Sequence, residues 1–373
     1  MVDWTQSMQQ TFEYYTVDPG TWMDVKKLQN VKSCTISRDS EAETLGSATM
    51  DIEESISECY IRSYLVTIQN GVRERHPLGT HLVQSPSTSF DGKRQSVSVD
   101  AYTPLIELKE SNPPIGMYIP KYNSSDPNTD IDIMELASKY VNENARAPVV
   151  NIKSLSDIEK TTLNYNFVAS TEDTWLTFLN DLIANARCTF ALDEMGRILF
   201  APKQDIAALQ PVWTYNDDNS SILHPEITVN RDMYGIPNVV EVIYSKSGDT
   251  FHSDMIRVVN DDPNSPISTV NRGREIVHRV TDPELPSISA IASTAKQQIE
   301  EYANRLLREL SVLEYTLSYT HGYCPVRIGD CVRLNYARAG LNNVKAKVIS
   351  QSINCKAGCQ VSEKAVFTTK LWG

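Results

Sequence analysis

The chain has 373 residues, of which 41% are hydrophobic and 22% are charged, and its formal net charge is −12. This composition excludes a mainly disordered chain and predicts two or three domains with ordinary hydrophobic cores. The acidity argues against a protein that grips phosphates or reads a nucleic-acid sequence, because such proteins concentrate lysine and arginine. It either keeps the protein soluble or lines a conduit that repels nucleic acid, and both explanations stay open.

No apolar run approaches the roughly 20 residues that a membrane-spanning helix needs, and the N-terminus has no basic patch before an apolar core. We therefore expect a soluble protein with no membrane-spanning segment and no secretory signal. The chain has an odd number of cysteines, which lie in strand-like segments and are expected to be reduced, mostly buried thiols. They are Cys34, Cys59, Cys188, Cys324, Cys331, Cys355 and Cys359.

The first hundred residues are predicted to form short strands, separated by Gly, Asn, Asp and Ser turns, in a sandwich or small barrel. Asn70-Gly71 is the strongest hairpin signal, because both residues tolerate the positive φ of a tight primed turn. We expect this turn to fix the register of its flanking strands. The predicted strands are residues 11–16, 31–38, 44–51, 60–69, 80–85 and 95–101.

The middle of the chain predicts a linker followed by a small α+β unit. Residues 111–130 are rich in Pro, Asn, Ser and Asp, which is typical of a linker. Helical spacing of apolar residues predicts one helix over 131–141 and another after Ser170. Alternating residues 188–192 and 198–202, joined by the turn at 193–196, predict a hairpin behind the second helix.

The last third predicts a sheet wrapped around one long helix. Apolar residues recur every three or four positions over 288–310, which indicates a helix with one buried face. Pro286 stops the preceding element, and Ser287 or Ser289 can cap the first amides. Alternation predicts strands, with turns at 329–330 and 356–358. These strands are residues 222–229, 238–244, 254–259, 312–320, 326–336, 344–355 and 360–368.

Several short motifs, taken in their order along the chain, resemble those of bacteriophage tail and baseplate hub proteins. They are residues 35–40 (TISRDS), 46–50 (GSATM), 172–176 (EDTWL), 188–202 (CTFALDEMGRILFAP), 260–268 (NDDPNSPIS) and 327–334 (RIGDCVRL). The resemblance implies an α+β, mainly β fold. It implies a first tail-tube-like β-barrel domain at residues 1–105, a linker and central α+β region at 106–215, and a second such barrel with the long helix at 216–373.

The resemblance also implies a function for the chain. It implies a structural hub protein of a tail tip or baseplate, a homotrimeric ring that joins the tail tube or distal tail proteins to a spike or fibre protein. The ring would form part of the channel for the tape-measure protein and for transient, non-specific passage of DNA. We expect the protein in the virion, after assembly in the host cytoplasm. Residues after Trp372 show no lysozyme or spike extension, so those parts are expected on separate proteins.

No catalytic, cofactor-binding or metal-binding residue is predicted, and we expect no cofactor and no enzymatic activity. The histidines lack zinc-site spacing, and no glycine-rich phosphate loop is present. Cys355 and Cys359, across a hairpin turn, are expected to face the core rather than to serve redox chemistry or a metal. The histidines are His76, His81, His224, His252, His278 and His321.

Paired carboxylates are the hardest signal to set aside. Adjacent residues on a strand point to opposite faces, and in polar loops they are usually solvated, so we favour solvated side chains over a glycosidase acid and base. Asp330 is expected to turn a hairpin after Gly329. The pairs are Glu53-Glu54, Asp217-Asp218 and Asp261-Asp262.

Aromatic and basic clusters leave two alternatives each. Core or subunit contacts are favoured over a sugar-stacking platform for Trp175, Tyr302, Tyr315 and Tyr319. The run of Arg272, Arg274 and Arg279 is either a solvated strand face or a contact with an acidic neighbouring subunit. Two rival functions remain beside the hub. A tail-associated peptidoglycan hydrolase needs a carboxylate or Cys-His cleft, and a receptor-binding adhesin needs exposed aromatic residues at a tip.

Overall fold

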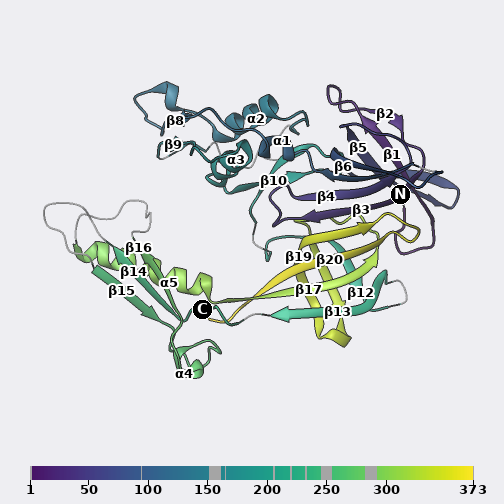
Figure 1. Cartoon of the computed structure of the whole chain (residues 1–373). Coiled ribbons are helices and arrows are strands. Elements are labelled where there is room, and N and C mark those ends of the chain that lie inside the picture. The colour runs from purple at the N-terminus through teal and green to yellow at the C-terminus, as the bar shows by residue number, and fades with distance from the viewer. Residues whose placement is uncertain are drawn as a thin grey trace. The chain divides into compact units, whose positions relative to one another are not determined.

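The computed structural model describes residues 2–93, 95–150, 161–163, 165–204, 206–218, 221–231, 233–244, 254–281 and 292–372. They form two compact units (Figure 1). Unit 1 comprises Met1–Ile227 and Tyr319–Ala365, and unit 2 comprises Thr228–Ser318 and Val366–Gly373. The chain passes between the units within three strands, which are β13 (Leu223–Arg231), β17 (Val312–Gly322) and β20 (Gln360–Lys370).

One large sheet runs through both ends of the sequence. Its strand order among the described residues is β13-β17-β20-β19-β3-β4-β7-β6-β5-β1-β2, with β18 joining β12 to β19. The N-terminal and C-terminal parts meet where β19 pairs with β3. The other strands are β1 (Gln9–Val17), β2 (Asp24–Lys27), β3 (Val31–Asp39), β4 (Gly46–Ile52), β5 (Tyr60–Gln69), β6 (Val72–Phe90), β7 (Gln95–Tyr102), β12 (Pro211–Asn216), β18 (Cys331–Tyr336) and β19 (Leu341–Asn354).

The mainly β fold is confirmed, but this strand order is an open path that closes no barrel within the described ranges. The predicted pair of barrels is therefore not confirmed. The Asn70-Gly71 turn is confirmed: its two residues have φ angles of +52° and +79°, and Gln69 pairs with Val72. Both positive φ values belong to a primed turn, whose twist matches that of the flanking strands.

The central α+β part of unit 1 has its own core. Helix α3 (Trp175–Ala184) begins at a capping box made by Thr174 and Thr177, and its apolar face packs beside α2 (Ile133–Asn144) and the hairpin of β10 (Cys188–Leu192) and β11 (Ile198–Pro202). The segment predicted as a linker contributes to this core, because Ile119 is buried there. The remaining elements are α1 (Ile106–Lys109), β8 (Tyr118–Ile119), η1 (Pro127–Thr129), β9 (Phe167–Val168) and η3 (Ala337–Ala339).

Unit 2 packs one helix on a small sheet. β14 (Val239–Tyr244) lies between β15 (Asp254–Val259) and β16 (Val277–Thr281), and α4 (Thr269–Arg272) precedes β16. The long helix α5 (Ala292–Leu310) buries an apolar stripe against Val240 and Val242. The predicted start of this helix and its caps, Pro286, Ser287 and Ser289, lie outside the described residues. None of the helices in the described ranges combines the length and apolar character that crossing a membrane requires.

A fully buried polar network lies among β12, β17, β19 and β20 in unit 1. Glu363 is 1% exposed, and its carboxylate accepts hydrogen bonds from the Tyr319 hydroxyl and, at 2.6 Å, from Gln351 Nε2. Tyr215 donates to the same carboxylate at 3.4 Å, and His321 Nε2 lies 3.4 Å from it. The buried charge of Glu363 is thus met by four polar groups.

The imidazole of His321 carries a positive charge in this network. Nδ1 donates to the carbonyl of Gly322 at 2.7 Å, and Nε2 lies 3.1 Å from the Tyr215 hydroxyl and 3.4 Å from Glu363. Because the Tyr215 hydroxyl donates its proton to Glu363, Nε2 is also a donor. Burial lowers the pKa of His321, but hydrogen bonds to Cys324 and Glu363 and the charge of Glu363 outweigh burial and raise the pKa to about 10. The network therefore contains a buried ion pair at neutral pH.

Replacing His321 by Gln is expected to destabilise the protein by about 3 kcal/mol near pH 6, because Glu363 is left without its cation. The folded pKa lies above the ordinary value of about 6.5, so the stabilisation from His321 is complete below pH 6.5 and is lost as the pH rises toward about 10. Urea unfolding of both proteins from pH 6 to 10 measures this. The difference in free energy of unfolding between the two proteins should become smaller as the pH rises. A difference that stays constant would contradict the ion pair. Exposed His224, changed to Gln, is the control.

Candidate functional site

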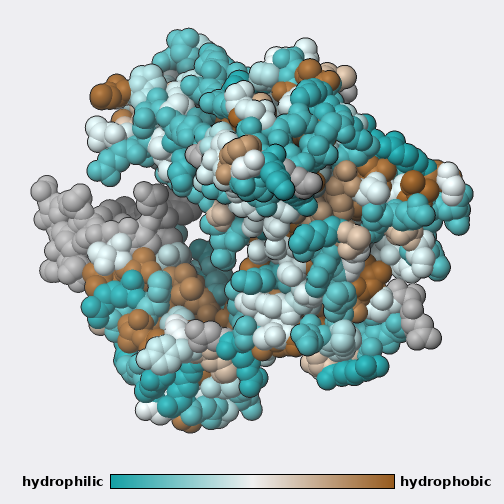
Figure 2. Space-filling view, turned by 45° about the vertical axis from the view of Figure 1, so that its right-hand side comes forward, coloured by the Kyte–Doolittle hydropathy of each residue, from teal (hydrophilic) through white to brown (hydrophobic). Residues whose placement is uncertain are grey.

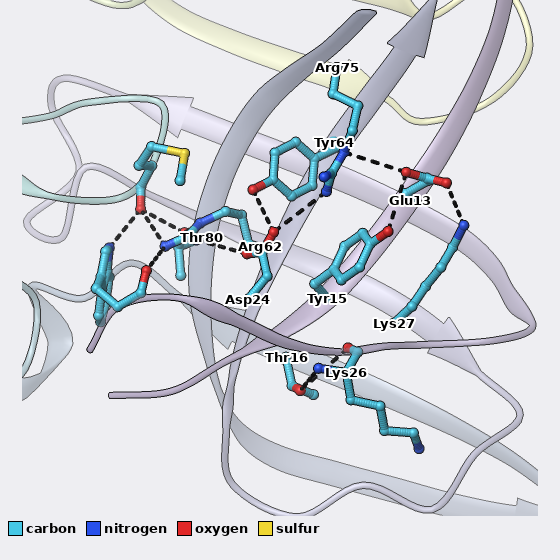
Figure 3. Close-up of polar contacts among 12 residues, drawn as sticks. Glu13, Tyr15, Thr16, Asp24, Lys26, Lys27, Arg62, Tyr64, Arg75 and Thr80 are labelled. Carbon is cyan, nitrogen blue, oxygen red and sulfur yellow. Dashed lines mark hydrogen bonds and ion pairs between the residues drawn. The ribbon is translucent and has the colours of Figure 1, made fainter. Parts of the chain in front are cut away.

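Charged and aromatic side chains gather on one face of the sheet at its β6-β5-β1-β2 end (Figure 3). The register places Arg62 opposite both Tyr15 on β1 and Thr80 on β6, and Val66 opposite Arg75. Residues opposite one another in a sheet share a face, so these side chains are neighbours. We call this set the β2 face; it consists of Glu13, Tyr15, Asp24, Lys27, Arg62, Tyr64, Arg73 and Arg75.

Arg62 anchors the inner end of the β2 face. Its side chain is 1% exposed, and it donates to Thr80 Oγ1 at 2.9 Å and to Asp24 at 2.8 Å (Figure 3). Further N–H groups reach the carbonyls of Trp22 at 3.2 Å and Met195 at 3.3 Å. A buried guanidinium is tolerated only with such partners, and here they come from β2, from β6 and from the β10–β11 turn.

One carbonyl group of the β10–β11 turn holds the turn against the sheet by hydrogen bonds. The carbonyl of Met195 accepts from Trp22 Nε1 at 2.9 Å and from Thr80 Oγ1 at 2.8 Å, in addition to Arg62. Gly196 follows with φ +72°, and a Cβ at this position would lie 2.6 Å from Thr80 Cβ. The glycine in the 188–202 motif therefore permits both the turn and its close approach to β6.

The outer end of the β2 face is a stacked, ion-paired surface. The Arg75 guanidinium lies 4.0 Å from the Tyr64 ring centre and 4.7 Å from that of Tyr15. Glu13 pairs with Lys27, with Arg73 at 3.0 Å and with Arg75 at 3.5 Å. Burial alone would raise the pKa of Glu13, but the hydrogen bond and charges of these three cations outweigh burial and lower it. Glu13 therefore stays ionised and holds the cations in place.

Basic charge predominates on this surface, although the whole chain is acidic. The exposed fractions of the side chains are 41% for Lys27, 51% for Arg73 and 35% for Arg75. Apolar Met23 and Val25 are 66% and 68% exposed on the same edge. β2 pairs only with β1 in the described sheet, so its other side presents unpaired backbone groups. Chemically, the surface is suited to binding an acidic or extended partner rather than to bond cleavage.

Most of the paired carboxylates have partners within the chain. Glu53 binds Lys32 at 3.0 Å, and Glu54 binds Lys26 at 2.6 Å. The hydrogen bond from Lys26 lowers the pKa of Glu54, which is the opposite of what a general acid requires. Asp217 pairs with Arg338 at 3.2 Å, Asp218 closes a turn with Ser221, Asp261 is exposed, and Asp262 accepts from the amide of Asn264.

A turn is present at Gly329-Asp330, but it does not join a hairpin as predicted, because β17 pairs with β13 and β20 whereas β18 pairs with β12 and β19. The Asp330 carboxylate accepts from the Arg327 amide at 2.8 Å, and Gly329 has φ +90°. Burial raises the pKa of Asp330. Cys355 and Cys359 are both buried in the core, as predicted. The structure brings together no group of three or more His, Cys, Asp and Glu residues suited to a metal within the ranges that it describes.

The aromatic residues occupy packing positions. Trp175 and Tyr319 are buried, Tyr302 packs beside the α5 core, and Tyr315 stacks on Phe367 with ring centres 4.6 Å apart. These contacts agree with the core assignment.

The arginine run serves unit 2 itself. Arg272 donates to the carbonyls of Met233 at 2.6 Å and Ile236 at 2.7 Å. Arg279 pairs with Glu241 at 2.7 Å. Arg274 lies over the ring of Tyr234 at 5.5 Å. These partners lie within unit 2, and the Arg279 side chain is 62% exposed. A contact of the run with a neighbouring subunit stays a prediction.

Sequence reasoning missed the β2 face. Each of its charges, taken alone, is typical of a solvated strand. One sequence feature could have indicated the β2 face. Arg73 and Arg75 alternate on a strand, and the Asn70-Gly71 turn pairs this strand with the preceding one. Asp24 and Glu13 lie too far away in sequence to be assigned as partners without the register.

Replacing Arg62 by Met is expected to lower the free energy of unfolding by about 3 kcal/mol, because Asp24 and the Met195 carbonyl lose their buried donor. Arg73 changed to Met removes an ion pair of an exposed side chain and should cost less than about 1 kcal/mol. Urea unfolding of the two variants measures the difference. Equal losses would show that the guanidinium of Arg62 does not hold the turn.

Comparison with known proteins gives a likeness of fold alone. Neither a protein-family model nor a curated protein sequence matches this chain. Among solved structures, it is similar to the tail protein from Neisseria meningitidis MC58, with 12% identity, a TM-score of 0.62 and coverage of 96% of this chain and 97% of the other.

The 43 kDa tail protein of prophage MuSo2 from Shewanella oneidensis gives 12% identity, a TM-score of 0.58 and coverage of 95% and 98%. A chain of the Francisella PdpA–VgrG complex gives 9% identity and a TM-score of 0.54, over 97% of this chain and 58% of that one. Because two of these matches extend over almost the full length of both partners, the chain has, as a whole, the fold of phage tail proteins.

Proposed function

We propose that this chain is a structural hub protein of a bacteriophage tail tip or baseplate. In this proposal three copies form a ring that joins the tail tube, or distal tail proteins, to a spike or fibre protein. The ring contributes part of the channel for the tape-measure protein and then for DNA. The observation that carries the proposal is the likeness to a tail protein over 96% of this chain and 97% of the other.

The surface of unit 1 supports an assembly role. An exposed edge strand such as β2 can add a strand or loop from a neighbouring chain, because its outer amide and carbonyl groups are unpaired. Met23 and Val25 provide apolar contact beside it, and the cations of the β2 face provide charge complementarity to an acidic neighbour. A chain with a net charge of −12 supplies acidic surfaces for such a contact between copies.

The acidic balance also supports conduction. An acidic wall repels phosphates, so DNA passes without sticking. On the face drawn in Figure 2, hydrophobic residues form small groups among hydrophilic ones. Small patches suit a protein that is soluble before assembly and binds through several limited contacts. In the proposed ring, a pair of tail-tube-like domains in each chain would present six similar domains to a sixfold tube.

The proposed function predicts a trimer in solution, measured by light scattering on a size-exclusion peak and by negative-stain imaging of that peak. The double variant Met23→Asp, Val25→Lys should shift the peak toward monomer, because it places charge at the proposed contact. Ile115→Lys changes another exposed apolar residue, 91% exposed, and should leave the mass unchanged.

A monomer at every concentration, together with loss of turbidity when the pure protein is added to cell walls, would favour the hydrolase instead. Binding of the monomer to host cells would favour the adhesin. A trimer that the double variant leaves intact would retain the hub and reject β2 as its contact.

A further inference from the structure

A pocket of about 50 Å³ lies inside unit 1 where four segments of the chain converge. Its walls come from β3, from β6, from the β10–β11 turn and from the loop before β18. The residues that decide its chemistry are Arg38, Gly79, His81, Asp193, Gly196 and Arg327. On this measure about 10–15 Å³ is enough to hold one water, so the pocket has room for a few waters or for a small ion.

Arg38 brings a positive charge to this pocket without a carboxylate partner. Its guanidinium donates to Gln351 Oε1 at 3.0 Å and to the carbonyl of Leu78 at 2.7 Å, and both acceptors are uncharged. No ion pair of Arg38 exists within the described ranges of the chain. A guanidinium has five N–H donors, so the remaining ones are available to a ligand.

The neighbouring charges are mostly paired with one another. Arg327 pairs with Glu194 at 2.6 Å, and Arg197 pairs with Asp193 at 2.5 Å. The next carboxylate beyond Gln351 is Glu363, which is already paired with His321. Asp330, which accepts from the Arg327 amide, adds a further carboxylate beside the Arg327–Glu194 pair. Among the described residues that line the pocket, Arg38 is the cation that makes no ion pair. A half-buried guanidinium without a carboxylate partner attracts an anion, because a charge-assisted hydrogen bond to it is stronger than a neutral one.

His81 supplies a second polar group without a partner. The side chain is 3% exposed, and its Nδ1 is buried with no hydrogen-bond partner. Its ring packs over Gly79, where an added Cβ would lie 2.9 Å from His81 Cε1, so the absence of a side chain at Gly79 leaves room for the ring. Burial and the charge of Arg38 lower the pKa of His81 to about 3. The neutral ring still has one N–H donor, and unsatisfied buried polar groups of this kind mark ligand or water sites.

We propose that this pocket binds one monovalent anion of halide size, held by the Arg38 guanidinium and by an N–H of His81. Chloride is the natural ligand of this chemical class. The site is independent of the proposed hub function. Because its walls include Asp193 and Gly196 from the β10–β11 turn as well as β3 and β6, the bound ion would fasten the hairpin to the sheet beside the contact made by Met195.

Bromide tests the proposal because it replaces chloride and is visible by anomalous diffraction. A crystal of the full chain grown in sodium bromide should show an anomalous peak within hydrogen-bond distance of Arg38. In solution, replacing gluconate by bromide at constant ionic strength should raise the thermal midpoint saturably by about 3 °C or more once bromide exceeds its Kd about tenfold. Arg38→Gln should abolish the rise, and Arg338→Gln, at a side chain of unit 1 that is 74% exposed, should retain it.

Ordered water without an anomalous peak in the pocket would overturn the proposal, even if Arg38→Gln fails to fold. A bromide effect of equal size in the Arg38→Gln and Arg338→Gln variants would also overturn it, because a general salt effect on the surface would then account for the stabilisation.

Discussion

The carbonyl of Met195 and the guanidinium of Arg62 form the contact on which the organisation of unit 1 depends. Arg62 is buried in the sheet and must find acceptors, and it finds them on β2, on β6 and on the β10–β11 turn. One interaction thus fixes the position of the short edge strand and the position of the hairpin. The edge strand carries the proposed assembly surface, and the hairpin closes one wall of the Arg38 pocket.

Buried polar groups recur throughout unit 1 and act by specifying geometry. The Glu363 network links four strands, and through Gln351 it reaches Arg38 and the pocket. Such networks add little net stability compared with apolar packing, but each misplacement leaves a charge unsatisfied, so a single arrangement is favoured. A rigid sheet of this kind suits a part that has to present fixed edges to neighbours on both sides, as the proposed hub does.

Local signals in the sequence were sufficient for local structure. The Asn70-Gly71 hairpin, helix α3 and the 188–202 hairpin were predicted because turn chemistry and apolar periodicity are properties of neighbouring residues. Residues 111–130 were predicted as a linker on composition, yet Ile119 is buried against the helices, because a few apolar residues in a polar segment are enough to anchor it.

The pairing of strands that lie far apart in the chain could not be predicted from the sequence. Nothing in the alternation of β3 or β19 indicates that the two strands pair across more than 300 positions, and the open strand order follows from that pairing. Arg38 lies in a motif noted only for its place in the chain order, and its role depends on the absence of a carboxylate that the fold alone reveals. The β2 face likewise required the register.

The central claim is that copies of this chain close a ring through the β2 edge. A cryo-electron microscopy reconstruction of the assembled protein, or of a tail tip that contains it, tests this most directly. The account predicts three copies around an axial channel, with Met23 and Val25 buried against the next copy. A ring in which both side chains face solvent, or an assembly without threefold symmetry, would contradict it.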